Sequence, residues 1–91
     1  MRIVYFGSDV YLSTFLYLAD HHQILALYTY HNDEDYFHEY AIVNEANNRN
    51  IPVYYEDITT NKIKKWVEKD RCELFFSAEY NRIIPVPIDY D

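Results

Sequence analysis

The feature that most constrains this chain is an unbroken apolar run at residues 3–6, with the sequence Ile-Val-Tyr-Phe. A strand with one face in water alternates apolar and polar residues, so a continuous apolar run predicts a strand that is buried on both faces. Such strands are typical of parallel sheets, whose faces are covered by the helices that connect one strand to the next. Three similar runs predict strands at residues 24–30, 53–55 and 74–78.

Segments with helical spacing separate the predicted strands. The first carries apolar residues at positions i, i+3, i+4 and i+7, namely Leu12, Phe15, Leu16 and Ala19. Two more helices are predicted at residues 36–48, where Asn50 and Pro52 provide stop signals, and at residues 61–69. Strands that alternate with helices predict one α/β domain over residues 1–91, with a small Rossmann-like, doubly wound parallel sheet of about four strands.

The net charge of −7, from 8 basic and 15 acidic residues, argues against a nucleic-acid partner, because phosphate binding requires a basic surface. The one basic cluster is typical of a solvated helix face: Lys62, Lys64, Lys65, Lys69 and Arg71. Cys72 is the only cysteine and lacks a CxxC partner, so we interpret it as structural and expect a cytoplasmic protein. The opening apolar run is too short for a signal peptide or a membrane span, so no membrane association is expected.

Gly7 is the only glycine in the chain. A dinucleotide site needs three glycines and a P-loop is also glycine-rich, so both kinds of site are disfavoured. We interpret Gly7 as part of a tight turn in which Ser8 or Asp9 caps the helix that follows. Because ligands of open α/β sheets bind at the carboxyl ends of strands, we expect a site among residues 7–11, 30–35 and 77–84.

The segment after the second predicted strand is rich in side chains that can bind metal ions: His31, Asn32, Asp33, Glu34, Asp35, His38 and Glu39. No pair among them has the spacing of a metal motif, so an acidic surface loop is the preferred interpretation and no metal site is predicted. His21 and His22 are expected at the end of the first helix, where the helix dipole favours them.

Three stretches follow one another in an order and at spacings that match a known family. They are MRIVYFGS at residues 1–8, ANNRNIPV at residues 46–53 and LFFSAEYNRII at residues 74–84. Together they resemble the N-terminal domain of the folate-dependent formyltransferases, which act on methionyl-tRNA, glycinamide ribonucleotide or sugar amines. Residues 30–40 and the acidic charge look more like the sugar-amine branch, whose substrate would be an amino-sugar nucleotide.

The resemblance implies that the segment after the fourth strand binds the pterin of 10-formyltetrahydrofolate, through backbone groups and apolar side chains. The candidates for this cofactor site are Ser77, Tyr80, Asn81, Arg82, Ile83 and Ile84. Burial of Ile83 and Ile84 in the core is an equally favoured interpretation. The first loop would face the small-molecule amine substrate, with Gly7, Ser8, Asp9 and Tyr11 as the candidates.

The family's catalytic Asn and His form an Asn-x-His pattern on the next strand, and its catalytic Asp follows later. The resemblance therefore implies that all three would lie beyond Asp91, and that the fourth strand would have a bare edge. An unpaired apolar edge favours pairing with another chain, so we expect a homo-oligomer through this edge or through residues 85–91. The alternative function is a non-catalytic α/β binding or oligomerisation module. A small enzyme of flavodoxin-like type has only topology in its favour.

We predict that these 91 residues alone do not transfer formyl groups. Formyl transfer requires an amide to stabilise the developing oxyanion and an imidazole to move protons. The resemblance implies that the Asn and the His with these roles would lie beyond Asp91. An assay with 10-formyltetrahydrofolate and an amino-sugar nucleotide should detect no product above background. Measurable turnover would contradict the prediction.

Overall fold

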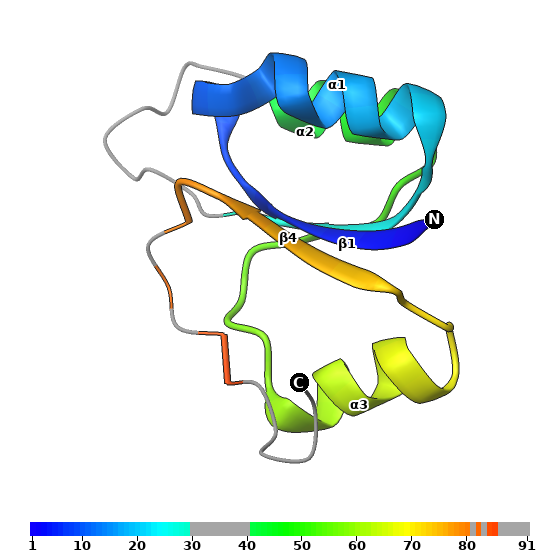
Figure 1. The fold of residues 1–91 in the computed structure, drawn as a ribbon. Helices are drawn as coiled ribbons and strands as arrows, with labels where there is room; N and C mark the ends of the chain where they lie inside the picture. Colours follow the sequence, from blue (N-terminus) through cyan, green and yellow to red (C-terminus); the bar gives the residue numbers. More distant parts are fainter. Residues whose placement is uncertain (30–40, 81, 83, 86–91) are drawn as a thin grey trace.

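The structure, a computed structural model, describes residues 1–29, 41–80, 82, 84 and 85. Four strands form one sheet: β1 (Arg2–Gly7), β2 (Gln23–Tyr28), β3 (Val53–Tyr54) and β4 (Leu74–Ala78). The helical elements are η1 (Asp9–Tyr11), α1 (Leu12–His21), α2 (Ala41–Asn48) and α3 (Thr60–Glu68). The strand order is β3-β2-β1-β4 and every neighbouring pair is parallel (Figure 1). This confirms the small Rossmann-like α/β fold that the sequence predicts.

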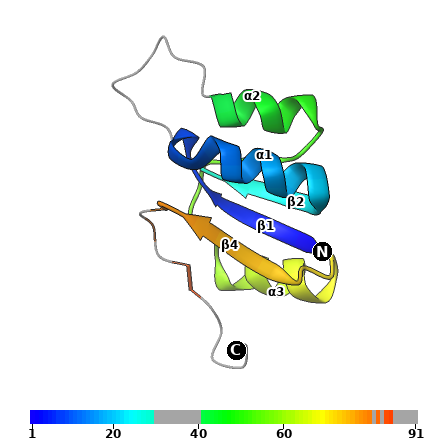
Figure 2. The same ribbon diagram turned by 45° about the horizontal axis from the view of Figure 1, so that its top comes forward.

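The sheet is covered on both faces, with α1 and α2 on one side and α3 on the other (Figure 2). Alternate residues of β1 point to the two opposite faces of the sheet. Ile3 and Tyr5 lie in the core beneath α1 and α2, whereas Val4 and Phe6 lie in the core against α3. All four side chains are almost fully buried. The apolar run at residues 3–6 therefore has the two-sided burial that its composition predicts.

β1 lies at the centre of the sheet. It pairs with β2 from Arg2 opposite Gln23 onwards, and with β4 from Ile3 opposite Leu74 to Gly7 opposite Ala78. Among the described residues, β4 pairs only with β1 and so forms one edge of the sheet. No helix within the described ranges combines the length and the apolar character that a membrane span requires.

Aromatic rings account for much of both cores. On the α1 side, the ring of Tyr5 stacks on Phe76 with centroids 5.5 Å apart. On the α3 side, the ring of Tyr28 stacks between Phe6 at 5.2 Å and Tyr54 at 4.9 Å. The indole N–H of Trp66 donates a hydrogen bond of 3.1 Å to the Tyr28 hydroxyl. Burial raises the pKa of the Tyr28 phenol, which therefore stays protonated in this core.

Two helices end at a residue in the left-handed conformation. Asn50 has φ 60°, and the N–H of Ile51 donates to the carbonyl of Ala46, as the predicted stop signal requires. Arg71 has the same φ of 60° after α3, and the N–H of Cys72 donates to the carbonyl of Trp66. The sequence did not mark this second terminator, because arginine is uncommon at a position that favours glycine or asparagine.

The predicted element boundaries differ from the observed ones by a few residues. The strand predicted at residues 24–30 is β2, which begins one residue earlier because the N–H of Gln23 donates to the carbonyl of Met1. The helix predicted at residues 36–48 is α2 from Ala41 onwards, and residues 36–40 lie outside the described residues. The helix predicted at residues 61–69 is α3, which begins at Thr60. The preceding residue, Thr59, caps it, because its hydroxyl accepts a hydrogen bond from the N–H of Lys62.

Replacing Tyr28 with phenylalanine should destabilise the domain by about 1–3 kcal/mol, because the indole N–H of Trp66, a residue that is only 5% exposed, would lose its acceptor. Trp66 is the only tryptophan, so its fluorescence during urea unfolding measures the change directly. Tyr17→Phe is the matched control, because the Tyr17 side chain is exposed. Equal stabilities of the two variants would show that the buried hydrogen bond contributes nothing.

Candidate functional site

The chain changes from one face of the sheet to the other between β1 and β4. After β1 it enters η1 and α1 on one face, whereas after β4 it turns towards α3 on the opposite face (Figure 1). These two strands are direct neighbours. In open α/β sheets, ligands bind outside the carboxyl ends of strands at such a switch point. Of the three predicted site segments, residues 7–11 and the described part of residues 77–84 therefore begin side by side, at the carboxyl ends of β1 and β4.

Gly7 is the last residue of β1 and lies opposite Ala78, the last residue of β4. A Cβ atom on Gly7 would lie 2.9 Å from the carbonyl oxygen of Ala78 and 2.9 Å from a ring carbon of Tyr5. The prediction that Gly7 is part of a tight turn is wrong, because Gly7 belongs to β1 and does not have a positive φ. The absence of a side chain instead allows the two strand ends to approach each other closely.

Asp9 caps a helix, but a different helix from the predicted one. Its two carboxylate oxygens accept hydrogen bonds from the backbone N–H groups of Ala41, at 3.2 Å, and Ile42, at 2.9 Å, at the start of α2. The side chain of Ser8 makes no capping bond to η1. The predicted cap of the following helix is therefore wrong, because the turn of η1 moves Asp9 away from α1 and towards α2.

The remaining candidates of the first loop differ in exposure. Ser8 is partly buried, whereas the Tyr11 side chain is 46% exposed. The carbonyl of Tyr11 accepts a hydrogen bond of 3.4 Å from the hydroxyl of Tyr5, which ties the loop to the core. Of these candidates, Ser8 and Tyr11 make no capping hydrogen bond through their side chains.

The segment after β4 folds back against the α3 side of the sheet. Glu79 has φ 56°, which redirects the chain directly after the strand. The ring of Tyr80 then packs 5.2 Å from the ring of Phe6, and Ile84 joins the same core. Ile84 is thus partly buried against this core, which agrees with one of the two interpretations. Ser77 is exposed, and Asn81 and Ile83 lie outside the described residues.

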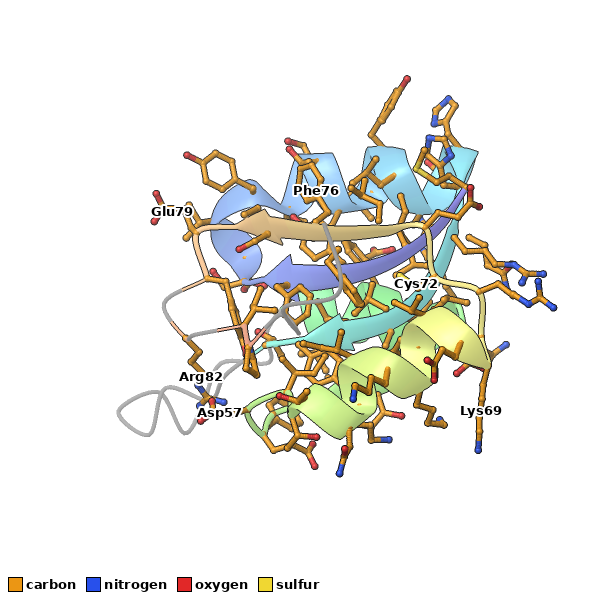
Figure 3. All side chains as sticks on the ribbon, turned by 60° about the horizontal axis from the view of Figure 1, so that its bottom comes forward. Asp57, Lys69, Cys72, Phe76, Glu79 and Arg82 are labelled. Atoms are coloured by element: carbon orange, nitrogen blue, oxygen red, sulfur yellow. The ribbon has the colours of Figure 1, made fainter. Side chains whose placement is uncertain are left out.

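Arg82 attaches this segment to the connection between β3 and α3. Its guanidinium donates to the carbonyl of Tyr55, and its Nε atom lies 3.3 Å from a carboxylate oxygen of Asp57 (Figure 3). Nearby, the hydroxyl of Thr60 donates a bond of 3.4 Å to the carbonyl of Pro85. The structural role of Asp57 was missed by sequence reasoning, because no motif connects it to a residue 25 positions later in the chain.

The remaining candidates in the described part of the chain do not gather into a metal-binding group. In residues 1–29, 41–80, 82, 84 and 85, no group of three or more His, Cys, Asp or Glu residues could hold a metal ion. The loop that begins at His31 lies outside the described residues. The Cys72 thiol is buried, and burial raises its pKa, which makes it a poor nucleophile and agrees with a structural role. His21 ends α1, with its Nδ1 atom 2.8 Å from the carbonyl of Tyr17.

An open groove of about 560 Å³ lies at the opposite end of the sheet, beside the amino ends of β1 and β2. Charged and polar side chains line it, together with Met1: Arg2, Asp20, His21, His22, Gln23 and Glu73. Because ligands of parallel α/β sheets bind at the carboxyl ends of strands, this groove is not the site that the topology favours.

A search against protein-family models and curated proteins found no match to this chain. The structure itself shows that the ends of β1 and β4 meet at the switch point, where Gly7 lies opposite Ala78.

Replacing Asp9 with alanine should destabilise the domain by about 0.5–2 kcal/mol, because two N–H groups at the start of α2 would lose their acceptor. Asp9→Asn keeps a capping oxygen and should cost less. Chemical denaturation followed by circular dichroism measures both values. A loss no larger than that of Asp20→Ala, which removes an exposed carboxylate, would contradict this role for Asp9.

Proposed function

We propose that this domain binds 10-formyltetrahydrofolate at the switch point between β1 and β4, as part of an enzyme that transfers the formyl group to an amine, such as an amino-sugar nucleotide. The observation that supports the proposal is the pairing of Gly7 with Ala78. This pair joins the two segments that the family resemblance assigns to substrate and cofactor, although they are about 70 residues apart in the sequence.

The described residues fit a pterin through their backbone more than through their side chains. Tyr80, Arg82 and Ile84 are used to hold the segment after β4 against the core and the β3–α3 connection. Ser77 is exposed at the end of β4, and the left-handed turn at Glu79 redirects the peptide groups that follow. Peptide N–H and carbonyl groups can bind the polar edge of a pterin. In this proposal the backbone of the segment binds the pterin, and the side chains of Tyr80, Arg82 and Ile84 hold that backbone in position.

The first loop would hold the amine substrate beside the cofactor. Gly7 brings the end of β1 close to β4, and Ser8 and Tyr11 present a hydroxyl and an aromatic ring at the same edge. Asp9 would act indirectly, because its carboxylate positions α2 relative to this loop. In this proposal the domain binds and orients both ligands, while an Asn, a His and an Asp outside it supply the acid–base and oxyanion chemistry.

The alternative is a non-catalytic α/β binding module. It is favoured by the structural use of candidate side chains: Asp9 caps α2, Tyr80 packs on Phe6, and Arg82 binds the Tyr55 carbonyl. Such a module would need no reactive group at the switch point. The two functions differ in whether a folate binds there.

We expect 5-formyltetrahydrofolate, a stable analogue of the formyl donor, to perturb backbone amide resonances at two places, residues 7–11 and 77–82. Two-dimensional NMR of the labelled protein during a titration measures this pattern. p-Aminobenzoylglutamate, which lacks the pterin, is the matched control ligand and should leave these amides unchanged.

Two results would contradict the proposal. One is the absence of any perturbation at millimolar folate, which would favour the non-catalytic module. The other is a set of perturbations confined to the groove at the amino ends of β1 and β2, around His22 and Glu73, which would move the binding site to the opposite end of the sheet.

A further inference from the structure

The segment after β4 begins with a backbone conformation that its residue type disfavours. Glu79 has φ 56°, in the left-handed region. Asn50 and Arg71 share this region, but each of them ends a helix, whereas Glu79 follows a strand at the switch point. A left-handed residue other than glycine costs free energy and persists where its surroundings hold it, most often at functional sites. The contacts that hold the chain after Glu79 therefore bear on the candidate site.

Those contacts lead to the connection between β3 and α3. The guanidinium of Arg82 reaches two acceptors in this connection: it donates to the carbonyl of Tyr55, and its Nε atom lies 3.3 Å from a carboxylate oxygen of Asp57 (Figure 3). The connection is itself anchored, because the next residue, Ile58, is only 3% exposed in the core against α3. Asp57 therefore projects from a backbone that is held in place, and it gives Arg82 a defined point of attachment.

The pair of Asp57 and Arg82 contributes little to the stability of the fold. The side chain of Asp57 is 73% exposed and that of Arg82 is 34% exposed, and water screens ion pairs at such positions. The pair has a stronger effect on direction, because a planar guanidinium with two acceptors is fixed in orientation as well as in position. Its geometry therefore bears on where the segment after β4 lies more than on whether the domain folds.

We propose that Asp57 is a positioning residue for the ligand-binding segment that follows β4. It acts through Arg82: the carboxylate orients the guanidinium, and the guanidinium holds the turn that starts at Glu79 against the connection between β3 and α3. The inference rests on the proposed function for the identity of the ligand, whereas the effect on the turn needs no ligand. A turn without this attachment has more conformations, so a ligand that binds its peptide groups must order it and loses affinity.

The first test is made without a ligand. Asp57→Asn removes the charge and keeps the shape of the side chain, so the amide resonances of residues 79–82 should shift in two-dimensional NMR of the labelled protein. Glu56→Gln is the matched control, because it removes the neighbouring exposed carboxylate and should leave these resonances unchanged. Urea unfolding followed by Trp66 fluorescence should give both variants nearly the same stability, which separates positioning from a general loss of structure.

The second test measures the affinity for 5-formyltetrahydrofolate by NMR titration. Asp57→Asn should raise the dissociation constant several-fold relative to Glu56→Gln, a comparison that cancels the effect of removing one negative charge near an anionic ligand. Arg82→Lys keeps the positive charge but loses the planar group that reaches both acceptors, so it should weaken binding to a similar extent. Asp57→Asn should then have little further effect in the Arg82→Lys background, because Asp57 acts through Arg82.

The two tests separate this inference from the proposed function. Unchanged resonances of residues 79–82 in Asp57→Asn would overturn the inference, whether or not a folate binds. An unchanged dissociation constant, or effects of Asp57→Asn and Arg82→Lys that simply add, would also overturn it. If the unsubstituted protein binds no folate, the proposed function fails, and shifted resonances in Asp57→Asn alone still support the positioning of the turn by Asp57.

Discussion

The burial of β1 on both faces, with hydrogen bonds along both edges, is the constraint on which the other elements depend. One set of its side chains requires a cover from α1 and α2, and the other requires α3. Its two edges require β2 and β4, whose own side chains extend the same two cores. A charge at any of residues 3–6 would be buried in one of the two cores at a large cost in desolvation free energy, and this run contains none. The topology follows, because parallel neighbours on both edges demand crossover helices.

The parts of the fold that depend on local patterns could be predicted from the sequence. The apolar runs located all four strands, and the spacing of Leu12 and Phe15 located α1. The left-handed Asn50 was predicted because its residue type and the following Pro52 both indicate a helix end. Arg71 adopts the same conformation without such a residue type. Its conformation is imposed by the return of the chain from α3 to β4, a tertiary requirement that overrides local preference.

Less of the candidate site than of the fold could be predicted from the sequence. Sequence reasoning placed residues 7–11 and 77–84 at the carboxyl edge, because chain topology alone determines where strand ends meet. It could not determine how each side chain is used there. The carboxylate of Asp9 binds N–H groups that lie more than 30 residues away in the chain, and Arg82 binds an acceptor before α3. Contacts of this kind leave no spacing signal, because neither partner has a fixed position relative to the other.

The central place of β1 also has a consequence for biosynthesis. Of the four strands that the structure describes, β1 is synthesised first, yet one of its two neighbours is β4, which is synthesised after the other three. Until β4 is made, the residues of β1 that face it have neither hydrogen-bond partners nor a complete apolar cover. A continuous apolar run must therefore stay partly uncovered while β2, β3 and the helices between β1 and β4 are synthesised. We expect the nascent chain to need protection during that interval, because the β1–β4 ladder can close only after β4 has been made.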